Sequence, residues 1–243
     1  MSYQVLAPEA QPCVWMCAGL ISYRLCDRGF ACETCPLDGA LRGQLRATTA
    51  SQTHLDRRAD EGMFPEDRLY SPGHSWVQAL SLEDGRRWRV GLDAFATALV
   101  GCAIGVRWGP LRKAFQRGDR LCEVDLGLGS IGLAAPISGR LARGNRVLEA
   151  RPETLVTDPY GDGWILEMEG LDPGGILGLR SAGRAREQSG QDLRRFRRSL
   201  ALRLLTESGE DPRPAATPEG SPRDLRQVLC GHHYVELLEQ FIH

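Results

Sequence analysis

The chain has 243 residues, of which 42% are hydrophobic, and a formal net charge of −1 at pH 7. This composition is typical of a globular protein of one or two domains, and it lacks both the basic excess of a nucleic-acid-binding protein and an apolar stretch long enough to span a membrane. The first residues, Met1-Ser2-Tyr3-Gln4, show no basic and apolar segments of a secretory signal, so we expect a cytoplasmic, reducing location where disulfides are rare.

Residues 1–44 form a cysteine-rich module. The pair Cys32 and Cys35 has the Cys-x2-Cys spacing that brings two thiolates within reach of one metal ion, and Cys26 and Cys13 can complete a tetrahedral shell. Cys17 is the alternative fourth ligand, one turn from Cys13 if that segment is helical. Four thiolates suit zinc, which we expect first, or an iron–sulfur cluster. A module this short has a small core, so a bound metal would supply folding energy.

Two other interpretations of these cysteines stay open. Free cysteine behaves as a small hydrophobic residue and is often buried. The second interpretation is a redox-active Cys-x2-Cys pair. Such pairs typically follow a strand in a βαβ unit, and the sequence pattern indicates no such unit here. Residues 45–68 are polar and charged, which predicts a linker before the next domain.

Residues 69–183 carry three motifs in a fixed order. Leu69 to Val77 reads Leu-Tyr-Ser-Pro-Gly-His-Ser-Trp-Val, Ala135 to Gly139 reads Ala-Pro-Ile-Ser-Gly, and Asp158 to Ile165 reads Asp-Pro-Tyr-Gly-Asp-Gly-Trp-Ile. Together they resemble the H protein of the glycine cleavage system, which carries a lipoyl arm between enzymes. The resemblance implies a barrel-sandwich hybrid domain, so the expected fold class is mainly β with α, and it implies a protein that is not itself an enzyme.

Local patterns within this region predict individual elements. Short strands are expected at 88–92, 121–124 and 164–168. A short helix is expected between Asp93, which can cap its start, and Gly101, which can end it.

The lipoyl lysine of the H-protein family has no counterpart in this chain. In the family it lies eight residues before the Pro of Ser-Pro-Val-Ser-Gly, and the residue eight before Pro136 is Leu128. Lys113, the sole lysine of the sequence, falls in the loop before that hairpin. A lipoyl amide needs a primary amine at an exposed turn, so we expect no lipoate on this protein.

The remaining sequence predicts two helices. In residues 184–206 one apolar stripe recurs at three- and four-residue steps, and it consists of Leu193, Phe196, Leu200 and Leu204. Residues 207–222 are rich in Pro, Gly, Glu and Ser, which predicts a disordered linker. Residues 223–243 predict an amphipathic helix too short to be stable alone. We expect it to pack on the 184–206 stripe, in the same chain or in a second copy, which would allow self-association.

These features favour a non-catalytic adaptor or regulator that resembles the H protein, is not lipoylated and has a metal-stabilised N-terminal module. Its partner would be a protein, because neither a membrane nor a nucleic acid is indicated. The first alternative is a redox or sulfur-metabolism accessory protein with an iron–sulfur cluster or reactive thiols. The second is a glycine cleavage carrier, which requires a lipoyl group elsewhere on the chain.

Overall fold

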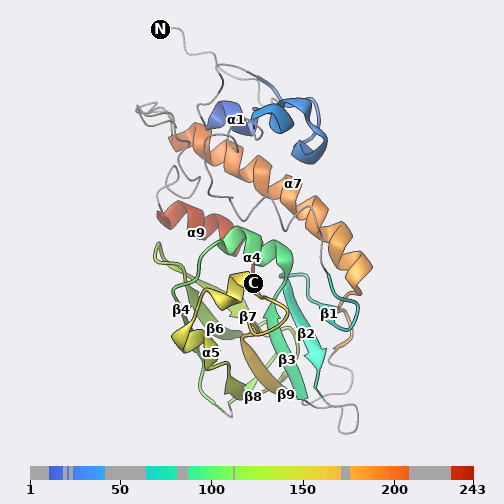
Figure 1. The fold of residues 1–243 in the computed structure, drawn as a ribbon, viewed down its shortest axis with the longest axis vertical. Coiled ribbons are helices and arrows are strands. Elements are labelled where there is room, and N and C mark those ends of the chain that lie inside the picture. The colour runs from blue at the N-terminus through green and yellow to red at the C-terminus, as the bar shows by residue number, and fades with distance from the viewer. Residues whose placement is uncertain are drawn as a thin grey trace. The chain divides into compact units, whose positions relative to one another are not determined.

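The computed structural model describes residues 11–18, 21, 24–41, 64–80, 87–111, 113–170, 176–207 and 231–243 (Figure 1). The chain divides into two compact units. The cysteine unit comprises Met1–Gln52 and Asp192–Gly231, and the β unit comprises Thr53–Gln191 and His232–His243. None of the helices in the described ranges has the length and apolar character that crossing a membrane requires.

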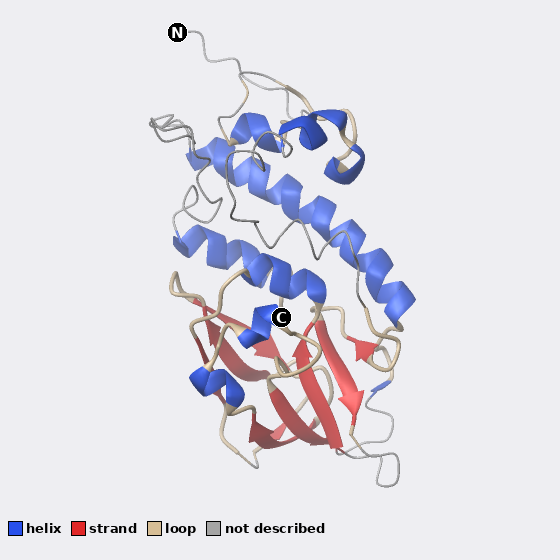
Figure 2. Ribbon diagram, viewed as in Figure 1, coloured by secondary structure: helices blue, strands red, loops and turns tan. Residues whose placement is uncertain are grey.

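The β unit contains two antiparallel sheets together with short helices, which confirms the predicted fold class (Figure 2). The larger sheet has the order β1 (Leu69–Tyr70), β2 (Ser75–Ala79), β3 (Arg87–Leu92), β9 (Leu166–Gly170), β8 (Gly139–Gly144) and β5 (Ala114–Phe115). The smaller sheet has the order β4 (Gly105–Trp108), β6 (Arg120–Asp125) and β7 (Ser130–Ala134). The strand predicted at 164–168 begins two residues later, because the carbonyl of Trp164 accepts a hydrogen bond from the Asn145 side chain instead of joining the ladder.

Helix α4 (Ala94–Val100) begins and ends where the sequence predicts. The Asp93 carboxylate accepts a hydrogen bond from the Ala96 N–H at 2.9 Å, which is the expected cap. Gly101 ends the helix with φ of 64°, a conformation that glycine adopts without a steric penalty. All the residues of α4 are buried. Because the helix has no polar face, it needs cover on the side away from the sheets as well.

Helix α9 (Gly231–Glu239) supplies this cover and lies beside α4 in Figure 1. The Tyr234 hydroxyl donates to the carbonyl of Leu99 at 2.6 Å. The ring of Phe241, just beyond α9, lies 6.4 Å from the ring of Phe95. The C-terminal segment therefore packs on its own chain, as expected, but these contacts are with α4, whereas we predicted the 184–206 stripe as the cover. The first part of the predicted helix, residues 223–230, lies outside the described residues.

Sequence reasoning did not predict α4 as a contact of α9, because α4 has no amphipathic stripe. A search for long segments with one apolar face passes over a short helix that is apolar on every side. The sequence of α4, Ala-Phe-Ala-Thr-Ala-Leu-Val, nevertheless indicates that other elements cover it, since a helix of this kind is stable in water only when it is buried on every side.

Helix α7 (Ala182–Glu207) confirms the helix predicted at 184–206. Its first turns belong to the β unit, where Ala182 and Ala185 pack with Phe64, Tyr70 and Trp76 in one apolar cluster. Phe64 falls within the predicted linker 45–68, yet its ring lies edge-on to Tyr70 at 5.3 Å. The β unit therefore includes at least Phe64 to Arg68, and the linker prediction was wrong at this end. The later turns of α7 belong to the cysteine unit.

Four short helical turns complete the described elements that have defined bounds. They are α1 (Val14–Cys17), the 3-10 turn η1 (Cys32–Thr34), α5 (Val147–Ala150) and α6 (Thr154–Thr157). The linker predicted at 207–222 lies outside the described residues, apart from the last residue of α7.

Candidate functional site

The turn between β6 and β7 contains Leu128. The Leu126 N–H donates to the carbonyl of Gly129 across the turn at 2.9 Å. The Gly127 N–H donates to the side chain of Asp125 at 2.9 Å. Gly127 and Gly129 both have positive φ, 75° and 146°, which side chains with a Cβ rarely adopt. The tip is thus a tight turn held by its own hydrogen bonds.

Leu128 is the exposed side chain of this turn. It is 45% exposed, whereas Leu126 is 8% exposed and points into the core. Ile104, which is 56% exposed, lies next to Gly127, where an added Cβ would come 3.6 Å from its Cδ1 atom. On the other flank, Val235 packs so closely on Gly129 that an added Cβ would come 2.9 Å from its Cγ2 atom. The tip is therefore an apolar projection with α9 against one side.

Lys113 lies elsewhere in the β unit. It directly precedes β5, at the edge of the larger sheet, whereas the turn belongs to the smaller sheet. Its carbonyl accepts a hydrogen bond from the Leu141 N–H, and its ammonium group lies 5.4 Å from the centre of the Phe115 ring. This amine therefore cannot take the place of the missing one at the tip.

A buried hydrogen bond joins the turn before β2 to helix α4. His74 Nδ1 lies 2.8 Å from a carboxylate oxygen of Asp93, and both side chains are almost fully buried. His74 has φ of 63°, and its carbonyl accepts a hydrogen bond from the Asp93 N–H at 2.9 Å. Its ring centre lies 4.1 Å from that of Phe95. Since Asp93 also caps α4, the pair acts as a structural connection, and sequence reasoning did not predict that these two residues meet.

In the cysteine unit, two of the predicted metal ligands lie on paired segments. The Cys13 N–H donates to the carbonyl of Arg24 at 2.9 Å, and the Cys26 N–H donates to that of Gln11 at 2.5 Å. The Cys26 sulfur in turn accepts a hydrogen bond from the Phe30 N–H at 3.3 Å. A donor of this kind stabilises a thiolate.

Cys32 and Cys35, the other two predicted ligands, lie at the start and just after the end of η1, and the Cys35 N–H donates to the carbonyl of Cys32 at 3.0 Å. All four predicted ligands are partly exposed. Within the described ranges of the chain, however, no three side chains of His, Cys, Asp or Glu lie close enough together to hold a metal ion. The structure thus pairs the Cys13 and Cys26 segments without assembling a four-sulfur shell.

The alternative ligand, Cys17, is a neutral thiol. Burial and, to a smaller extent, the neighbouring Cys13 raise the pKa of Cys17 to about 12. Burial likewise raises the pKa of Cys122, on β6, to about 12. Neither thiol is therefore ionised near neutral pH, so neither has the reactivity of a redox thiolate.

Comparison with known proteins decides the family. The protein-family model described as Glycine cleavage H-protein matches residues 68–191, which are just over half of the chain. The chain belongs to the glycine cleavage H-protein family. The described part of the matched region contains both sheets, α4 and the first turns of α7, so the resemblance seen in the three sequence motifs is confirmed.

Individual H-proteins match the same half of the chain. The glycine cleavage system H protein of Alteromonas mediterranea is 32% identical over 119 residues, which are 49% of this chain and 90% of that protein. The glycine cleavage system H protein of Thermus thermophilus is 29% identical over 120 residues, or 49% of this chain and 91% of that protein. The crystal structure of the H protein from Mycobacterium marinum is 27% identical, covers 53% of this chain and 98% of its own, and aligns with a TM-score of 0.45.

The tip of the β6–β7 hairpin is the place where the sequence motifs predict a difference from the H-protein family. The H-protein resemblance assigns the lipoyl lysine to position 128, and the structure places Leu128 at the exposed tip of that hairpin. The H-protein domain is also extended, since neither the cysteine-rich residues 11–41 nor helix α9 falls within the matched residues.

Proposed function

We propose that this protein is a non-lipoylated, non-catalytic member of the H-protein family that acts as an adaptor or regulator in the cytoplasm. The observation that carries the proposal is Leu128 at the tip of a well-formed hairpin. The turn is held by its own hydrogen bonds and by two glycines of positive φ, so the hairpin is well ordered while position 128 carries no amine. An exposed leucine beside the exposed Ile104 suits contact with an apolar surface of a protein partner.

Co-expression of the protein with a lipoate ligase, in medium containing lipoate, should leave its intact mass unchanged. The reason is that Leu128 has no nucleophilic nitrogen and Lys113 lies at a sheet edge rather than at a hairpin tip. Intact-mass spectrometry checks the result. A mass increase equal to one lipoyl group, mapped to Lys113, would contradict the proposal and favour the glycine cleavage carrier.

The Leu128→Lys variant is the matched control for this experiment. Because the turn is held by backbone bonds and by Asp125, the substitution should leave the hairpin intact and present an amine at the tip. We expect this variant to gain one lipoyl group. If it stays unmodified, the hairpin itself has lost recognition by the ligase, and the leucine alone does not explain the loss.

We further propose that a zinc ion stabilises the cysteine unit, with Cys13, Cys26, Cys32 and Cys35 as its ligands. The paired segments of Cys13 and Cys26 and the N–H donor to the Cys26 sulfur support the proposal. The separation of the four sulfurs requires that the turn of Cys32 and Cys35 closes on the other two when the ion binds. Coupling of this kind between metal binding and folding is common in small zinc modules.

Elemental analysis of protein purified without oxygen or chelators should find about one zinc per chain. Cys32→Ser and Cys35→Ser should each lower the zinc content strongly, because a shell of three thiolates binds zinc far more weakly. Cys102→Ser, which changes an exposed cysteine on the β unit, should retain the full zinc content. Protein that contains neither zinc nor iron would refute the metal proposal.

The redox alternative uses the same cysteines, and visible absorption distinguishes it from the zinc proposal. An iron–sulfur cluster gives strong visible absorption that zinc lacks, and it would make this protein an accessory of redox or sulfur metabolism. Since the thiols of Cys17 and Cys122 are kept neutral by burial, reactive thiols would have to come from among the partly exposed cysteines.

A further inference from the structure

Three neighbouring strands of the larger sheet carry two rows of Arg–Glu–Arg side chains. The outer row pairs Arg87 of β3 with Glu169 of β9, and Glu169 with Arg140 of β8. The inner row repeats the pattern two residues along β3 and β9 and three residues along β8, and it consists of Arg89, Glu167 and Arg143. We call the surface formed by these six residues the arginine face. Each row has two guanidinium groups for one carboxylate, so the face has an excess of positive charge.

A β-bulge in β8 creates the second row. Residues Arg140 and Arg143 are three positions apart, so in a regular strand their side chains would point to opposite faces of the sheet. The register between β8 and β9 shifts between Leu141 and Arg143, which turns Arg143 to the same face as Arg140. The bulge therefore aligns both arginines of β8 with the glutamates of β9.

The inner row is held together by its own ion pairs. Arg143 donates two hydrogen bonds of 2.7 Å to the carboxylate of Glu167, and Arg89 donates a third at 3.2 Å. Both guanidinium groups also lie over the ring of Trp164, at 4.7 Å for Arg89 and 5.2 Å for Arg143. The hydrogen bonds from Arg143 hold the pKa of Glu167 below its usual value. This row is therefore a rigid base for the arginine face.

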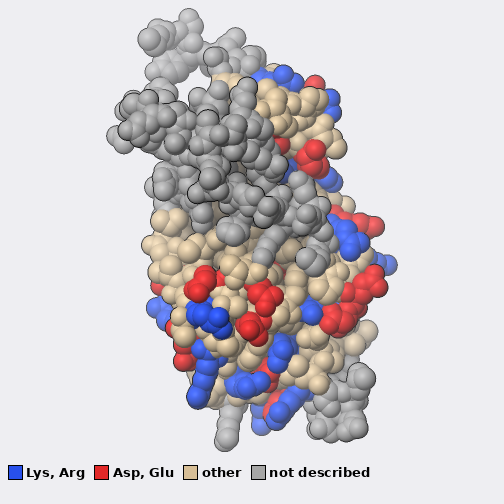
Figure 3. Space-filling view, viewed as in Figure 1, with Lys and Arg blue, Asp and Glu red and all other residues tan. Residues whose placement is uncertain are grey.

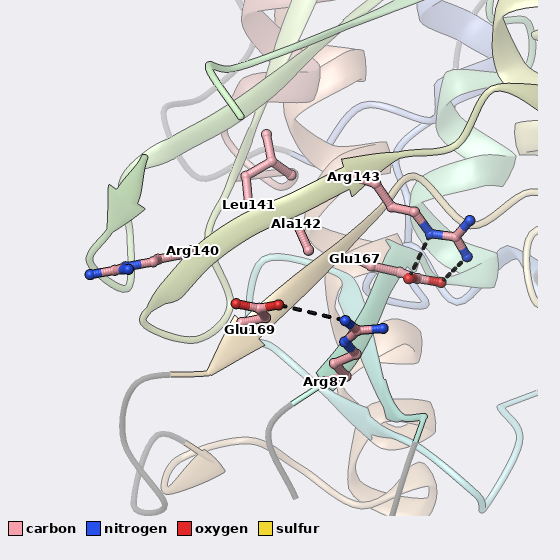
Figure 4. A pocket seen from close by; sticks show the side chains of 7 residues that line it. All are labelled: Arg87, Arg140, Leu141, Ala142, Arg143, Glu167 and Glu169. Carbon is pink, nitrogen blue, oxygen red and sulfur yellow. Dashed lines mark hydrogen bonds and ion pairs between the residues drawn. The ribbon is translucent and has the colours of Figure 1, made fainter. Parts of the chain in front are cut away.

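The outer row, by contrast, is open. Arg87 and Glu169 are 62% and 51% exposed, and their closest charged atoms are 3.8 Å apart. Among the residues that the structure describes, no carboxylate forms an ion pair with Arg140, which is exposed. The side chains surround a hollow of about 470 Å³. Figure 4 shows Glu169 between Arg87 and Arg140, with the Arg143–Glu167 pair above Arg87 in this view.

We propose that the arginine face binds an acidic segment of a protein partner, whose carboxylates pair with Arg87 and Arg140. Guanidinium groups match carboxylates in a two-point geometry, and two of them are presented here without a strong partner. Glu169 between them repels a dense polyanion such as RNA, while separated carboxylates can lie on either side of it. In Figure 3 basic and acidic side chains are interspersed over the visible surface, in keeping with a partner of mixed sequence. The inference concerns a face other than the hairpin tip and does not depend on the absence of lipoate.

The test uses the full chain and, as the probe, a fluorescent peptide in which single glutamates are separated by serines. We expect saturable binding that weakens with salt, and about a tenfold loss of affinity in Arg87→Glu/Arg140→Glu, because both contacts become repulsive. The control Arg107→Glu/Arg184→Glu makes the same change of net charge on β4 and α7, and it should bind nearly as the unmodified protein does. All four arginines are exposed; Arg87 is 3.8 Å from Glu169, and Arg107 pairs with Glu123 at 2.7 Å.

A second variant is expected to change the affinity for the peptide in the opposite direction. Glu169→Gln removes the carboxylate that competes for Arg87 and repels the probe, so it should bind the peptide several times more tightly. A merely structural role of Glu169 would not give tighter binding. The proposal is overturned if the unmodified protein does not bind the peptide, if both double variants lose affinity equally, or if RNA of equal charge binds more tightly than the peptide.

Discussion

Asp93→Ala is expected to lower the free energy of unfolding of the β unit by about 2–4 kcal/mol. The substitution removes the cap of α4, because the Asp93 carboxylate accepts the Ala96 N–H, and it leaves the His74 ring nitrogen buried without its partner. An unpaired polar atom in the interior cannot be rescued by water, so the two losses act together. Urea unfolding of the full chain measures the change as a lower midpoint with an unchanged slope.

Asp119→Ala is the matched control. Asp119 also accepts a backbone N–H, that of Gln116 at 2.8 Å, but its side chain is exposed and water replaces the lost bond. We expect a loss of only about 0.5 kcal/mol. Asp93→Asn keeps an oxygen for the Ala96 N–H, so its loss of unfolding free energy should lie between the losses in Asp93→Ala and Asp119→Ala. An equal loss in Asp93→Ala and Asp119→Ala would show that the buried pair contributes nothing beyond a cap.

Leu237→Ala should destabilise the β unit by about 2–5 kcal/mol, the range for leucine in a packed core. Leu237 is fully buried on α9, next to the residues that contact α4. The cavity weakens the contact between the two helices, so amide hydrogen exchange should become faster in α4 as well as in α9. Exchange measured by mass spectrometry at the level of peptides separates the two helices.

The control for this prediction is Leu111→Ala, which removes a side chain of the same size that is 62% exposed. It should change the free energy of unfolding by no more than about 0.5 kcal/mol. If Leu237→Ala leaves exchange in α4 unchanged while α9 loses protection, α9 is not the cover that α4 requires.

The elements that the sequence predicted well are those fixed by local chemistry. Asp93 and Gly101 delimit α4 by a cap and a positive φ, which depend on neighbouring residues only. Counting back eight residues from Pro136 likewise reached Leu128, which lies in the turn between β6 and β7. These features need no knowledge of distant parts of the chain.

The features that sequence reasoning missed are made by residues far apart in the chain. Arg87, Arg140 and Glu169 form one row only because β3, β9 and β8 are neighbours in the sheet, and the bulge that aligns Arg143 leaves no clear mark in the sequence. The meeting of His74 with Asp93 depends in the same way on how β2 pairs with β3. Pairings of this kind follow from topology, which periodicity alone does not determine.

The packing of α9 on α4 has a consequence for the way the protein is made. During synthesis from the N-terminus, α4 and both sheets emerge well before α9, which follows α7 and residues 208–230. Until α9 arrives, the outer side of α4 remains an uncovered apolar surface on a nearly complete domain. The nascent chain is then a substrate for chaperones, and a product of premature termination that lacks α9 would be prone to aggregation or proteolysis.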